Sequence, residues 1–496
     1  MKNISRRRFL RKVSLGAAGI AVSGLLSSCA EQKYSRPNII FILIDDLGWK
    51  DVGYHVSRLY ETPNIDKLAE EGMRFSAAYA ACPVCSPTRS SIMTGKYPAR
   101  LNQTDWIPGR GDNPENKFLQ VDDLNYLPLE EVTIAERLKE AGYVTCHIGK
   151  WHMGGAGHLP EDQGFDINIA GNERGSPPSY YYPYKRGDYQ LKELAATGQE
   201  GEYLIDRISR EAVQFITDHQ EQPFFLYLSH YAVHTPREAK ESLREYYEQK
   251  LDNMPEPEGP VYKDERYNAV TQLVQNNPEY AGMVQSMDES VGRVMRTLEE
   301  LDLANQTILF FMSDNGGLST LPPDRTASTA NTPLRAGKGW LYEGGIREPM
   351  IVKWPEVTSP GSVCNDPVIS TDFYPTILEM ARLELAPEQH QDGVSLVPLL
   401  RGGTSPDRDA LYWHYPHYHG SNARPHGAIR MGDYKLIEFY EDMSVEVYNL
   451  KQDLAEQHNL AASMPGKANT LREQLHNWRT SVGAEMPQPN PEYTPG

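Results

Sequence analysis

Cysteine is scarce in this sequence, with only five among 496 residues. Cys82 and Cys85, in the stretch CPVCSPTRSS, have the C-x-x-C spacing of a redox pair or of half a zinc site. Cys29, Cys146 and Cys364 stand singly, so no second pair completes a four-ligand structural zinc site. A thioredoxin-like pair lies early in a small domain, whereas this pair lies inside a long chain with nearby prolines. These features argue against zinc and redox chemistry, and they leave the purpose of Cys85 open.

Basic residues are also few: 49 Lys and Arg stand against 67 Asp and Glu, a net charge of −18. Residues 1–29 contain six basic groups and no acidic one, so the chain without them carries a net charge of about −24. Such an acidic surface argues against nucleic acid as a partner. It does not exclude a small anionic substrate, because lysine, arginine and a metal ion can invert the field inside one pocket.

The apolar stretch from Val13 to Leu26 is too short and too rich in small residues for a stable membrane span. It follows Arg6 and Arg7 in SRRRFLRK, the pattern of a twin-arginine export signal. The stretch ends in LSSC, which resembles a bacterial lipobox whose cysteine, here Cys29, is lipidated; a cleaved signal with a chance cysteine is the alternative. We expect residues 1–29 to be an export signal, and the remaining chain to be held in the bacterial cell envelope, at the membrane by its lipid alone.

After this segment, apolar strand patterns alternate with amphipathic helix patterns. Buried strands are expected at residues 37–46, 143–154, 223–229 and 307–317. Helices are expected from Asn64 with Leu68 and Met73 on one side, at 132–142 with Thr133 and Glu136 in capping-box spacing, at 203–215 and at 291–301. The alternation predicts an α/β fold with a mostly parallel sheet. The length of the chain after residue 29 suits a catalytic α/β domain at residues 36–405 and a smaller α+β domain at 406–496. In the smaller domain we expect a strand at 445–450 and a last helix at 471–478.

Polar side chains follow four of the expected strands. In chain order they are Asp45 and Asp46, Lys150 and His152, His234 slightly beyond its strand, and Asp314 and Asn315. Because ligands of open α/β sheets bind outside the carboxyl ends of the strands, these side chains can converge although they are distant in sequence. Each has an ordinary alternative, such as a helix cap for Asp45 or a hydrogen-bonded loop position for His152. The position that they share at strand ends favours a common site.

The types of these residues indicate the chemistry of that site. Three carboxylates and an amide are hard oxygen ligands, which favour calcium or magnesium over zinc. Arg89, Lys150 and Lys338 would supply positive charge and hydrogen bonds for a tetrahedral oxyanion. Lys338 lies in the glycine-rich stretch NTPLRAGKGWLYEGGIREP, whose glycines permit close approach of the backbone to a ligand; a solvent-facing lysine is the alternative.

Residues 85–95, CSPTRSSIMTG, resemble the signature of the formylglycine-dependent (type I) sulfatases of the alkaline phosphatase superfamily. Five further stretches resemble the other blocks of that family in the same order: DDLGWKD (45–51), GKWHMG (149–154), HTP (234–236), SDNGG (313–317) and GKGWLYEGGIREP (337–349). The similarity continues through DGVSLVPLL (392–400) and AIRMGDYKLI (428–437). It implies a large alkaline-phosphatase-like domain, followed by a smaller domain with an antiparallel sheet and a helix.

The resemblance also implies a purpose for Cys85. In the family, the matching cysteine is oxidised to formylglycine by a formylglycine-generating or sulfatase-maturating enzyme, which reads residues matching Pro87 and Arg89. The aldehyde hydrates to a diol; one oxygen attacks the sulfur of a sulfate ester, and proton loss from the other then expels sulfate. Placement of Cys85 at the start of a helix beginning near Pro87 would add backbone N–H groups for the anion.

Roles of other residues follow from the same resemblance. The implied ligands of one calcium ion are Asp45, Asp46, Asp314, Asn315 and the modified Cys85. Arg89 and Lys150 match residues that hold the diol and the sulfate, His152 matches the proton acceptor, and His234 and Lys338 match sulfate ligands near the leaving oxygen. Arg335 and Glu343 lie in matching blocks, and we expect them to be structural.

The sequence is less informative about the substrate. The stretch YWHYPHYHGS interleaves aromatic residues with His414, His417 and His419, which could stack on and hydrogen-bond a sugar ring; a packed loop between domains is the alternative. Because the sequence is most similar to those of bacterial polysaccharide sulfatases, we expect a sulfuric ester hydrolase that acts on a sulfated carbohydrate. A phosphomonoesterase or phosphonate hydrolase of the same superfamily is the nearest alternative. A glycan-binding lipoprotein without catalysis is another, but it predicts a lost catalytic residue and none is lost.

Overall fold

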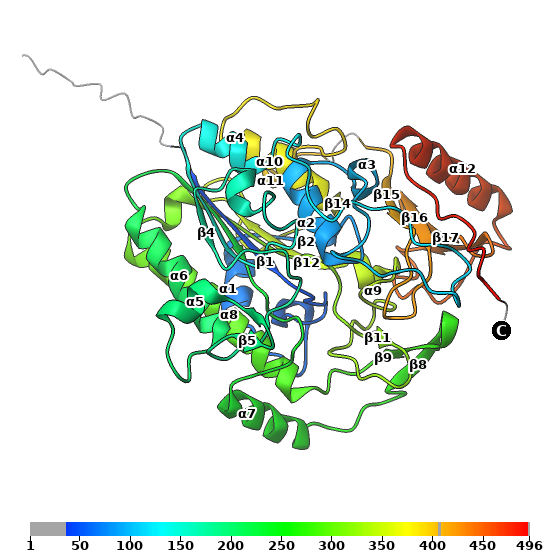
Figure 1. Ribbon diagram of the computed structural model, residues 1–496, viewed down its shortest axis with the longest axis horizontal. Helices are drawn as coiled ribbons and strands as arrows, with labels where there is room; N and C mark the ends of the chain where they lie inside the picture. Colours follow the sequence, from blue (N-terminus) through cyan, green and yellow to red (C-terminus); the bar gives the residue numbers. More distant parts are fainter. Residues whose placement is uncertain (1–35, 405–407, 495–496) are drawn as a thin grey trace, which may run out of the picture. The chain divides into compact units, whose positions relative to one another are not determined.

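The structure is a computed structural model that describes residues 36–404 and 408–494 (Figure 1). The expected export signal at residues 1–29, with Cys29, lies outside the described residues, and so does the expected boundary between residues 405 and 406. Among the helices of the described ranges, none has the length and apolarity needed to cross a membrane.

A nine-stranded sheet runs through the centre of the described chain. Its order is β13 (Ser362–Cys364), β2 (Met73–Tyr79), β12 (Arg347–Lys353), β10 (Thr307–Ser313), β1 (Asn38–Ile44), β7 (Phe224–Ser229), β3 (Val144–Gly149) and β4 (Ile167–Ile169), with β14 (Val368–Ile369) beside β2. Strand β12 pairs antiparallel with β10 and β2, and the other pairings of this sheet are parallel. The mostly parallel sheet predicted from the sequence is therefore confirmed.

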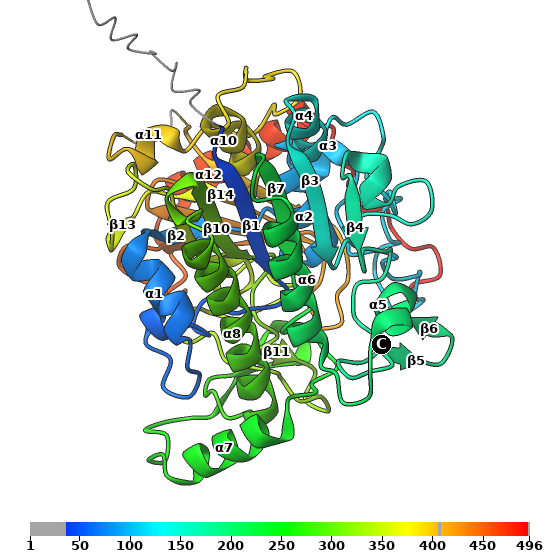
Figure 2. The same cartoon turned by 90° about the vertical axis from the view of Figure 1, so that its left-hand side faces the viewer.

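Helices cover both faces of this sheet, which explains why its strands are apolar throughout. All seven residues of β1 are buried, with Ile40 and Ile42 in one apolar cluster and Phe41 and Leu43 in another. The first cluster includes α1 (Pro63–Glu71), α6 (Leu204–Asp218) and α8 (Pro278–Glu300), which Figure 2 shows over one face. The second includes α2 (Cys85–Thr94), α4 (Ile134–Glu140), α10 (Phe373–Met380) and α11 (Val397–Leu400).

Smaller elements complete the catalytic part of the chain. Two small antiparallel sheets are formed by β11 (Thr320–Leu321), β9 (Ala269–Gln272) and β8 (Tyr262–Glu265), and by β5 (Lys185–Arg186) and β6 (Tyr189–Gln190). The remaining helices of this part are α3 (Pro98–Leu101), α5 (Lys192–Thr197), α7 (Glu241–Asp252) and α9 (Glu343–Ile346).

Several element ends differ from the sequence expectation. The capping box at α4 is confirmed, since the Thr133 side chain accepts from the Glu136 N–H at 3.1 Å and Glu136 accepts from the Thr133 N–H at 2.7 Å. Met73 does not belong to the helix before it, because α1 ends at Glu71 and Met73 opens β2, where it pairs with Val352. The strand expected to reach residue 154 ends at residue 149, and α2 begins at the cysteine itself, two residues before Pro87.

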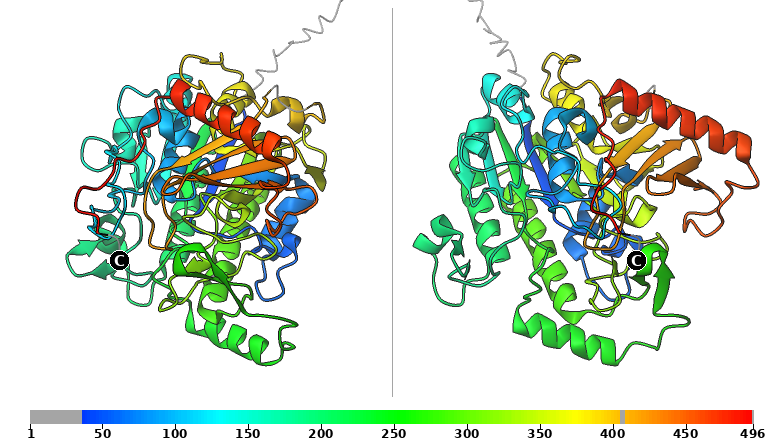
Figure 3. Two further views of the ribbon diagram at one scale, coloured as in Figure 1. Left: turned by 90° about the vertical axis from the view of Figure 1, so that its right-hand side faces the viewer. Right: turned by 45° about the vertical axis from the view of Figure 1, so that its right-hand side comes forward.

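The C-terminal part is an antiparallel sheet with one long helix, as predicted. The sheet order is β15 (Leu411–Tyr415), β16 (His426–Met431), β17 (Tyr434–Phe439) and β18 (Ser444–Asn449), and α12 (Pro465–Ser481) lies across it in Figure 3. The described chain from Arg36 onward forms one compact unit. A buried lysine joins the two parts, because Lys435 Nζ of β17 lies 2.9 Å from Glu343 of α9 and 3.0 Å from Glu456. This contact supports the structural role expected for Glu343.

Candidate active site

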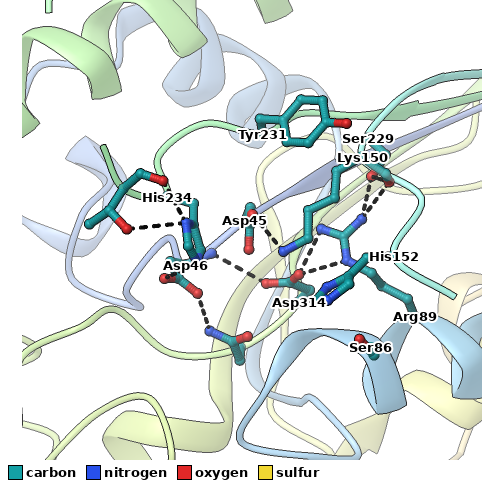
Figure 4. Close-up of polar contacts among 12 residues, drawn as sticks. Asp45, Asp46, Ser86, Arg89, Lys150, His152, Ser229, Tyr231, His234 and Asp314 are labelled. Atoms are coloured by element: carbon teal, nitrogen blue, oxygen red, sulfur yellow. Dashed lines mark hydrogen bonds and ion pairs between the residues drawn. The ribbon is translucent and has the colours of Figure 1, made fainter. Parts of the chain in front are cut away.

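The neighbouring parallel strands β10, β1, β7 and β3 end at the same edge of the sheet, and polar residues follow each of them. These are Asp314 and Asn315 after β10, Asp45 and Asp46 after β1, His234 beyond β7, and Lys150 and His152 after β3. Helix α2, which follows β2, adds Cys85 and Arg89. The predicted residues therefore converge, as Figure 4 shows for most of them.

Local backbone geometry makes this convergence possible. A Cβ at Gly149, the last residue of β3, would lie 1.9 Å from the carbonyl oxygen of Ser229, so glycine is needed where β3 meets the end of β7. Lys150 follows directly, and its N–H donates to the same carbonyl at 2.8 Å. Asp46 and His152 both have φ of +60°, the left-handed region that non-glycine residues adopt mainly where surrounding contacts hold them.

Arg89 connects three of the elements. Its Nε and one terminal nitrogen donate to Oδ2 of Asp314 at 2.9 and 2.7 Å. The other terminal nitrogen donates to the carbonyl of Lys150 at 2.7 Å and to Oγ of Ser229 at 2.6 Å. Figure 4 shows the guanidinium between these partners. Ser229 was not identified from the sequence, because a serine at the end of an apolar strand carries no distinctive pattern.

Two lysines bind the paired carboxylates. Lys150 Nζ lies 2.8 Å from Oδ2 of Asp45, and Lys338 Nζ lies 2.5 Å from Oδ1 of Asp46. Burial raises the pKa of Asp45 to about 8, and the Lys150 charge only partly opposes it. Burial also acts to raise the pKa of Asp46, but Lys338, His234 and Lys150 outweigh it and hold that pKa well below its usual range.

The arrangement of oxygens fits a cation. Ligand atoms of Asp45, Asp314 and Cys85 lie within 4.8 Å of one another, and those of Asp45, Asp46 and His234 do so as well. Oδ1 of Asp45 and Oδ1 of Asn315 are buried without a hydrogen-bond partner. Buried oxygens without a donor are costly unless a cation or water satisfies them. The donor set therefore suits a hard divalent ion.

The two histidines lie beside this group with different ring nitrogens engaged. Nε2 of His152 lies 2.6 Å from the carbonyl oxygen of Ile107, so Nε2 carries the hydrogen and Nδ1, which is buried and unpartnered, is free to accept a proton. Burial, followed by the Lys150 charge, lowers the pKa of His152 well below 6.5, which keeps the ring neutral. In His234, Nδ1 donates to the carbonyl of Thr235 at 2.8 Å, and Nε2 lies 3.7 Å from Oδ2 of Asp46.

A cavity of about 530 Å³ opens onto these residues. Its wall contains Cys85, His152, His234 and Lys338 from the predicted set, together with His419. Loop and hairpin residues form the remaining wall: Trp106, Ile107, Pro108, Glu173, Arg174, Gly175, Ser176 and Tyr189. The sequence analysis did not identify these wall residues, since none of them lies in a recognised motif.

His414 and His417 do not lie at the cavity, unlike His419. His414 is buried, and its two ring nitrogens lie 2.8 Å from the Tyr440 hydroxyl and 2.7 Å from the Glu485 carbonyl. His417 is 2% exposed, and its Nε2 lies 2.8 Å from the Thr104 hydroxyl. The expectation that these two histidines contact a sugar does not fit their positions, because packing between the C-terminal sheet and neighbouring loops uses both rings.

Cys82, Cys146, Cys364 and Arg335, which were also named from the sequence, do not line the cavity. Cys82, Cys85, Cys146 and Cys364 are buried free thiols in the described chain, so Cys82 and Cys85 form no disulfide there. Arg335 lies 2.7 Å from Glu265 and 3.0 Å from the Tyr448 hydroxyl, away from the cavity wall.

Fold and site together define a hydrolase for an ester of a tetrahedral oxyanion, with a nucleophile position beside carboxylates, lysines and histidines. The sulfatase family model matches residues 37–383, and a model described as "N-sulphoglucosamine sulphohydrolase, C-terminal" matches residues 336–481. The chain belongs to the sulfatase family and is a sulfuric ester hydrolase.

Relatives and solved structures agree with this assignment. A sulfatase of Formosa agariphila is 32% identical, over 93% of this chain and 92% of its own. The N-acetylgalactosamine-6-sulfatase of Canis lupus familiaris is 31% identical, over 85% of this chain and 74% of its own. The crystal structure of Ps i-CgsB has a TM-score of 0.71 at 31% identity, covering 90% of this chain and 93% of that one. Sulfatases generally use a formylglycine and a divalent metal ion.

Proposed function

We propose that this enzyme removes sulfate from a sulfated polysaccharide or its oligosaccharides, with formylglycine made from Cys85 and one calcium ion. The observation that carries the proposal is the position of the Cys85 sulfur, within 4.8 Å of carboxylate oxygens of Asp45 and Asp314 at the first residue of α2. Burial raises the pKa of the Cys85 thiol above its ordinary value, so the unmodified thiol is a poor nucleophile at neutral pH. This supports a precursor role for the thiol.

Calcium fits the residues that would hold it. Asp45, Asp46, Asp314 and Asn315 offer oxygen atoms, and two of these oxygens are buried without a donor. A bound calcium ion would supply positive charge that stabilises a deprotonated nucleophile and the sulfate oxygens. Lys150 and Lys338, each bound to one of the carboxylates, would add further positive charge to the site.

The remaining residues would position the reacting groups and move protons. Arg89 is fixed by Asp314, the Lys150 carbonyl and Ser229, so it can orient the residue at position 85 from one side. His152 can accept a proton at Nδ1, because Nε2–H is already donated to a carbonyl. His234 and Lys338 line the same cavity, where Lys338 can bind sulfate and supply a proton to the leaving oxygen. His234 can do so only after Nε2 takes up a proton, because its Nδ1–H is donated to the Thr235 carbonyl.

Two kinds of relatives support a sugar substrate. One is named for a 6-sulfate of N-acetylgalactosamine, and Ps i-CgsB was also solved in complex with k-i-k-neocarrahexaose, at 31% identity and a TM-score of 0.70. Trp106 and Tyr189 give the cavity wall two aromatic side chains, which suit the apolar face of a sugar ring.

Mass spectrometry of the peptide across Cys85, after expression with a maturation enzyme, tests the proposal together with sulfate release from a panel of sulfated sugars. An aldehyde at Cys85 and release from one sugar would support it. A persistent thiol with release of phosphate from phosphate monoesters would overturn it in favour of a phosphomonoesterase.

We also propose that the protein is exported folded by the twin-arginine route and anchored at Cys29 by lipid, in the cell envelope. This proposal rests on residues 1–29, which lie outside the described part of the structure. Folded export requires that the maturation enzyme oxidises Cys85 in the cytoplasm. Detergent partitioning of the mature protein tests the anchor, and a freely soluble mature form would contradict it.

A further inference from the structure

Two arginines lie over the same residue, Gly420, which directly follows a residue of the cavity wall. Arg325 donates to the carbonyl oxygen of Gly420 at 3.1 Å. A Cβ built on Gly420 would lie 3.4 Å from a terminal nitrogen of Arg325 and 3.7 Å from a terminal nitrogen of Arg110. Both arginines are exposed, and they come from separate loops, after α3 and after β11. Two guanidinium groups therefore converge on one turn of the chain.

This turn continues the wall of the catalytic cavity. His419 lines that cavity with Cys85 and Lys338, and Gly420 is the next residue. A Cβ at Gly339 would lie 2.1 Å from Nδ1 of His419, so the ring packs directly against the backbone that carries Lys338. Burial lowers the pKa of His419 to about 3, and the charges of Lys338, Arg110 and Arg325 contribute to the decrease. The three cations thus act on one ring of the cavity wall.

Neither arginine has an acidic partner within 4.0 Å in the described ranges, although the chain is acidic overall. Burial raises the pKa of Asp105, and the charge of Arg110 opposes that rise only from a distance. However, Oδ1 of Asp105 accepts from the Tyr415 hydroxyl and the Trp106 N–H, both at 2.9 Å. Two cations held close together repel each other, and an anion bound between them would offset this electrostatic repulsion.

We propose that Arg110 and Arg325 form a second anion subsite, which binds another anionic group of the substrate while its reacting sulfate lies beside Cys85. The inference rests on the proposed function and narrows the substrate to saccharides that carry a second sulfate ester or a uronic carboxylate. Guanidinium groups bind both kinds of anion through paired N–H groups. Because the two side chains are exposed, the contribution of the two arginines to substrate binding decreases as the salt concentration increases.

The binding of anionic probes that contain no sugar tests the subsite. Isothermal titration calorimetry would use calcium-loaded Cys85→Ala protein, which cannot turn over, with alkanediol bis-sulfates of increasing length and the matching alkyl monosulfates. We expect one length of bis-sulfate to bind about tenfold more tightly than its monosulfate. Alkyl sulfates that end in a carboxylate form the second arm of the test, and they distinguish a sulfate partner from a uronic carboxylate.

Substitution of the two arginines then tests whether they cause the preference for the bis-sulfate over the monosulfate. In Arg110→Gln/Arg325→Gln the preference for the bis-sulfate should disappear, and Arg110→Gln alone, which spares the hydrogen bond to Gly420, should reduce it. Arg58→Gln/Arg401→Gln removes the same charge from exposed positions outside the cavity wall and should keep the preference. Equal binding of bis-sulfate and monosulfate by the parent protein, or a preference that survives in the double variant, would overturn the subsite. Failure of the proposed function would appear separately, as absence of sulfate release by matured protein whose bis-sulfate preference is intact.

Discussion

Arg89 and Asp314 are 225 positions apart in the sequence, yet they form a wholly buried ion pair with hydrogen bonds of 2.9 and 2.7 Å. The pair joins α2, whose first residue is Cys85, to the end of β10, which is followed by two of the proposed metal ligands. Its geometry therefore couples the position of the proposed nucleophile to that of the cation site. Removal of either partner would leave an uncompensated buried charge.

Replacement of Arg89 tests this coupling. In metal-free protein, Arg89→Gln should lower the free energy of unfolding by about 3–5 kcal/mol, because the Asp314 carboxylate loses its partner. Arg89→Lys retains the charge but not the planar fork, so it should destabilise less and still lower kcat by about 100-fold or more. Urea denaturation and sulfate release measure the two effects. A change in stability below about 1 kcal/mol in Arg89→Gln would contradict this account.

The two cysteines of the C-x-x-C stretch should behave differently. Cys85→Ala should fold with near-normal thermal stability and lose sulfate release, because it removes the proposed nucleophile. Cys82→Ala is the matched control: Cys82 is equally buried and its thiol contacts the Thr104 carbonyl at 3.6 Å, so its loss should cost about 1 kcal/mol and leave turnover in place. Thermal unfolding and sulfate release would separate the two. Retained turnover in Cys85→Ala would refute the assignment of the nucleophile.

Removal of the metal should affect stability as well as activity. Chelation should lower Tm and abolish sulfate release, because the buried Oδ1 atoms of Asp45 and Asn315 would then have no cation to satisfy them. Calcium should restore both properties at lower concentration than magnesium, since calcium accepts flexible coordination by carboxylate and amide oxygens, whereas magnesium requires near-octahedral geometry. Differential scanning calorimetry of stripped and reloaded protein measures the change. Restoration by zinc alone would argue against the oxygen-ligand assignment.

Substitutions of His419 and His417 should have contrasting effects, because only His419 lies at the cavity wall. His419→Ala should raise KM for a sulfated saccharide with little loss of stability, because the ring lines the cavity. His417→Ala should leave KM in place and lower the free energy of unfolding by about 1–3 kcal/mol, because it leaves the buried Thr104 hydroxyl without its partner. Steady-state kinetics and urea unfolding of both variants check the contrast. The opposite pattern would mean that the substrate reaches beyond the described cavity.

Stability should depend on pH through Asp105, which is buried and precedes Trp106 of the cavity wall. Burial raises its pKa to about 7, against the opposing hydrogen bonds of Tyr415 and Trp106. An unfolded aspartate titrates near about pH 3.9, so between that pH and about 7 the folded state keeps a proton that the unfolded state has lost. The free energy of unfolding should therefore fall as pH rises through this window.

Asp105→Asn should make that slope smaller, since Oδ1 can still accept from both partners. The slope should not vanish, because burial also raises the pKa of Asp123 to about 7. Urea unfolding at several pH values between about 5 and about 7.5 measures it. An unchanged slope in Asp105→Asn would show that other groups set the dependence.

The sequence was most informative where the signal is local. Strands β1, β7 and β10 and the capped start of α4 were predicted from runs of a few residues, because buried strands and capping boxes have short-range patterns. The polar residues after those strands were found in the same way. Residues with mixed signals were misplaced, as Met73 shows: its spacing suits the helix before it, but pairing with Val352 of β12 places it in a strand.

By itself, the sequence determined the fold class, the residues at the strand ends and the resemblance to sulfatases, because all three depend on short patterns. Only the tertiary structure decided which histidine of the stretch YWHYPHYHGS reaches the cavity, that Ser229 holds Arg89, and that Arg110 and Arg325 meet at Gly420. The physical reason is that irregular segments take their positions from packing against distant parts of the chain, and local patterns do not encode that packing.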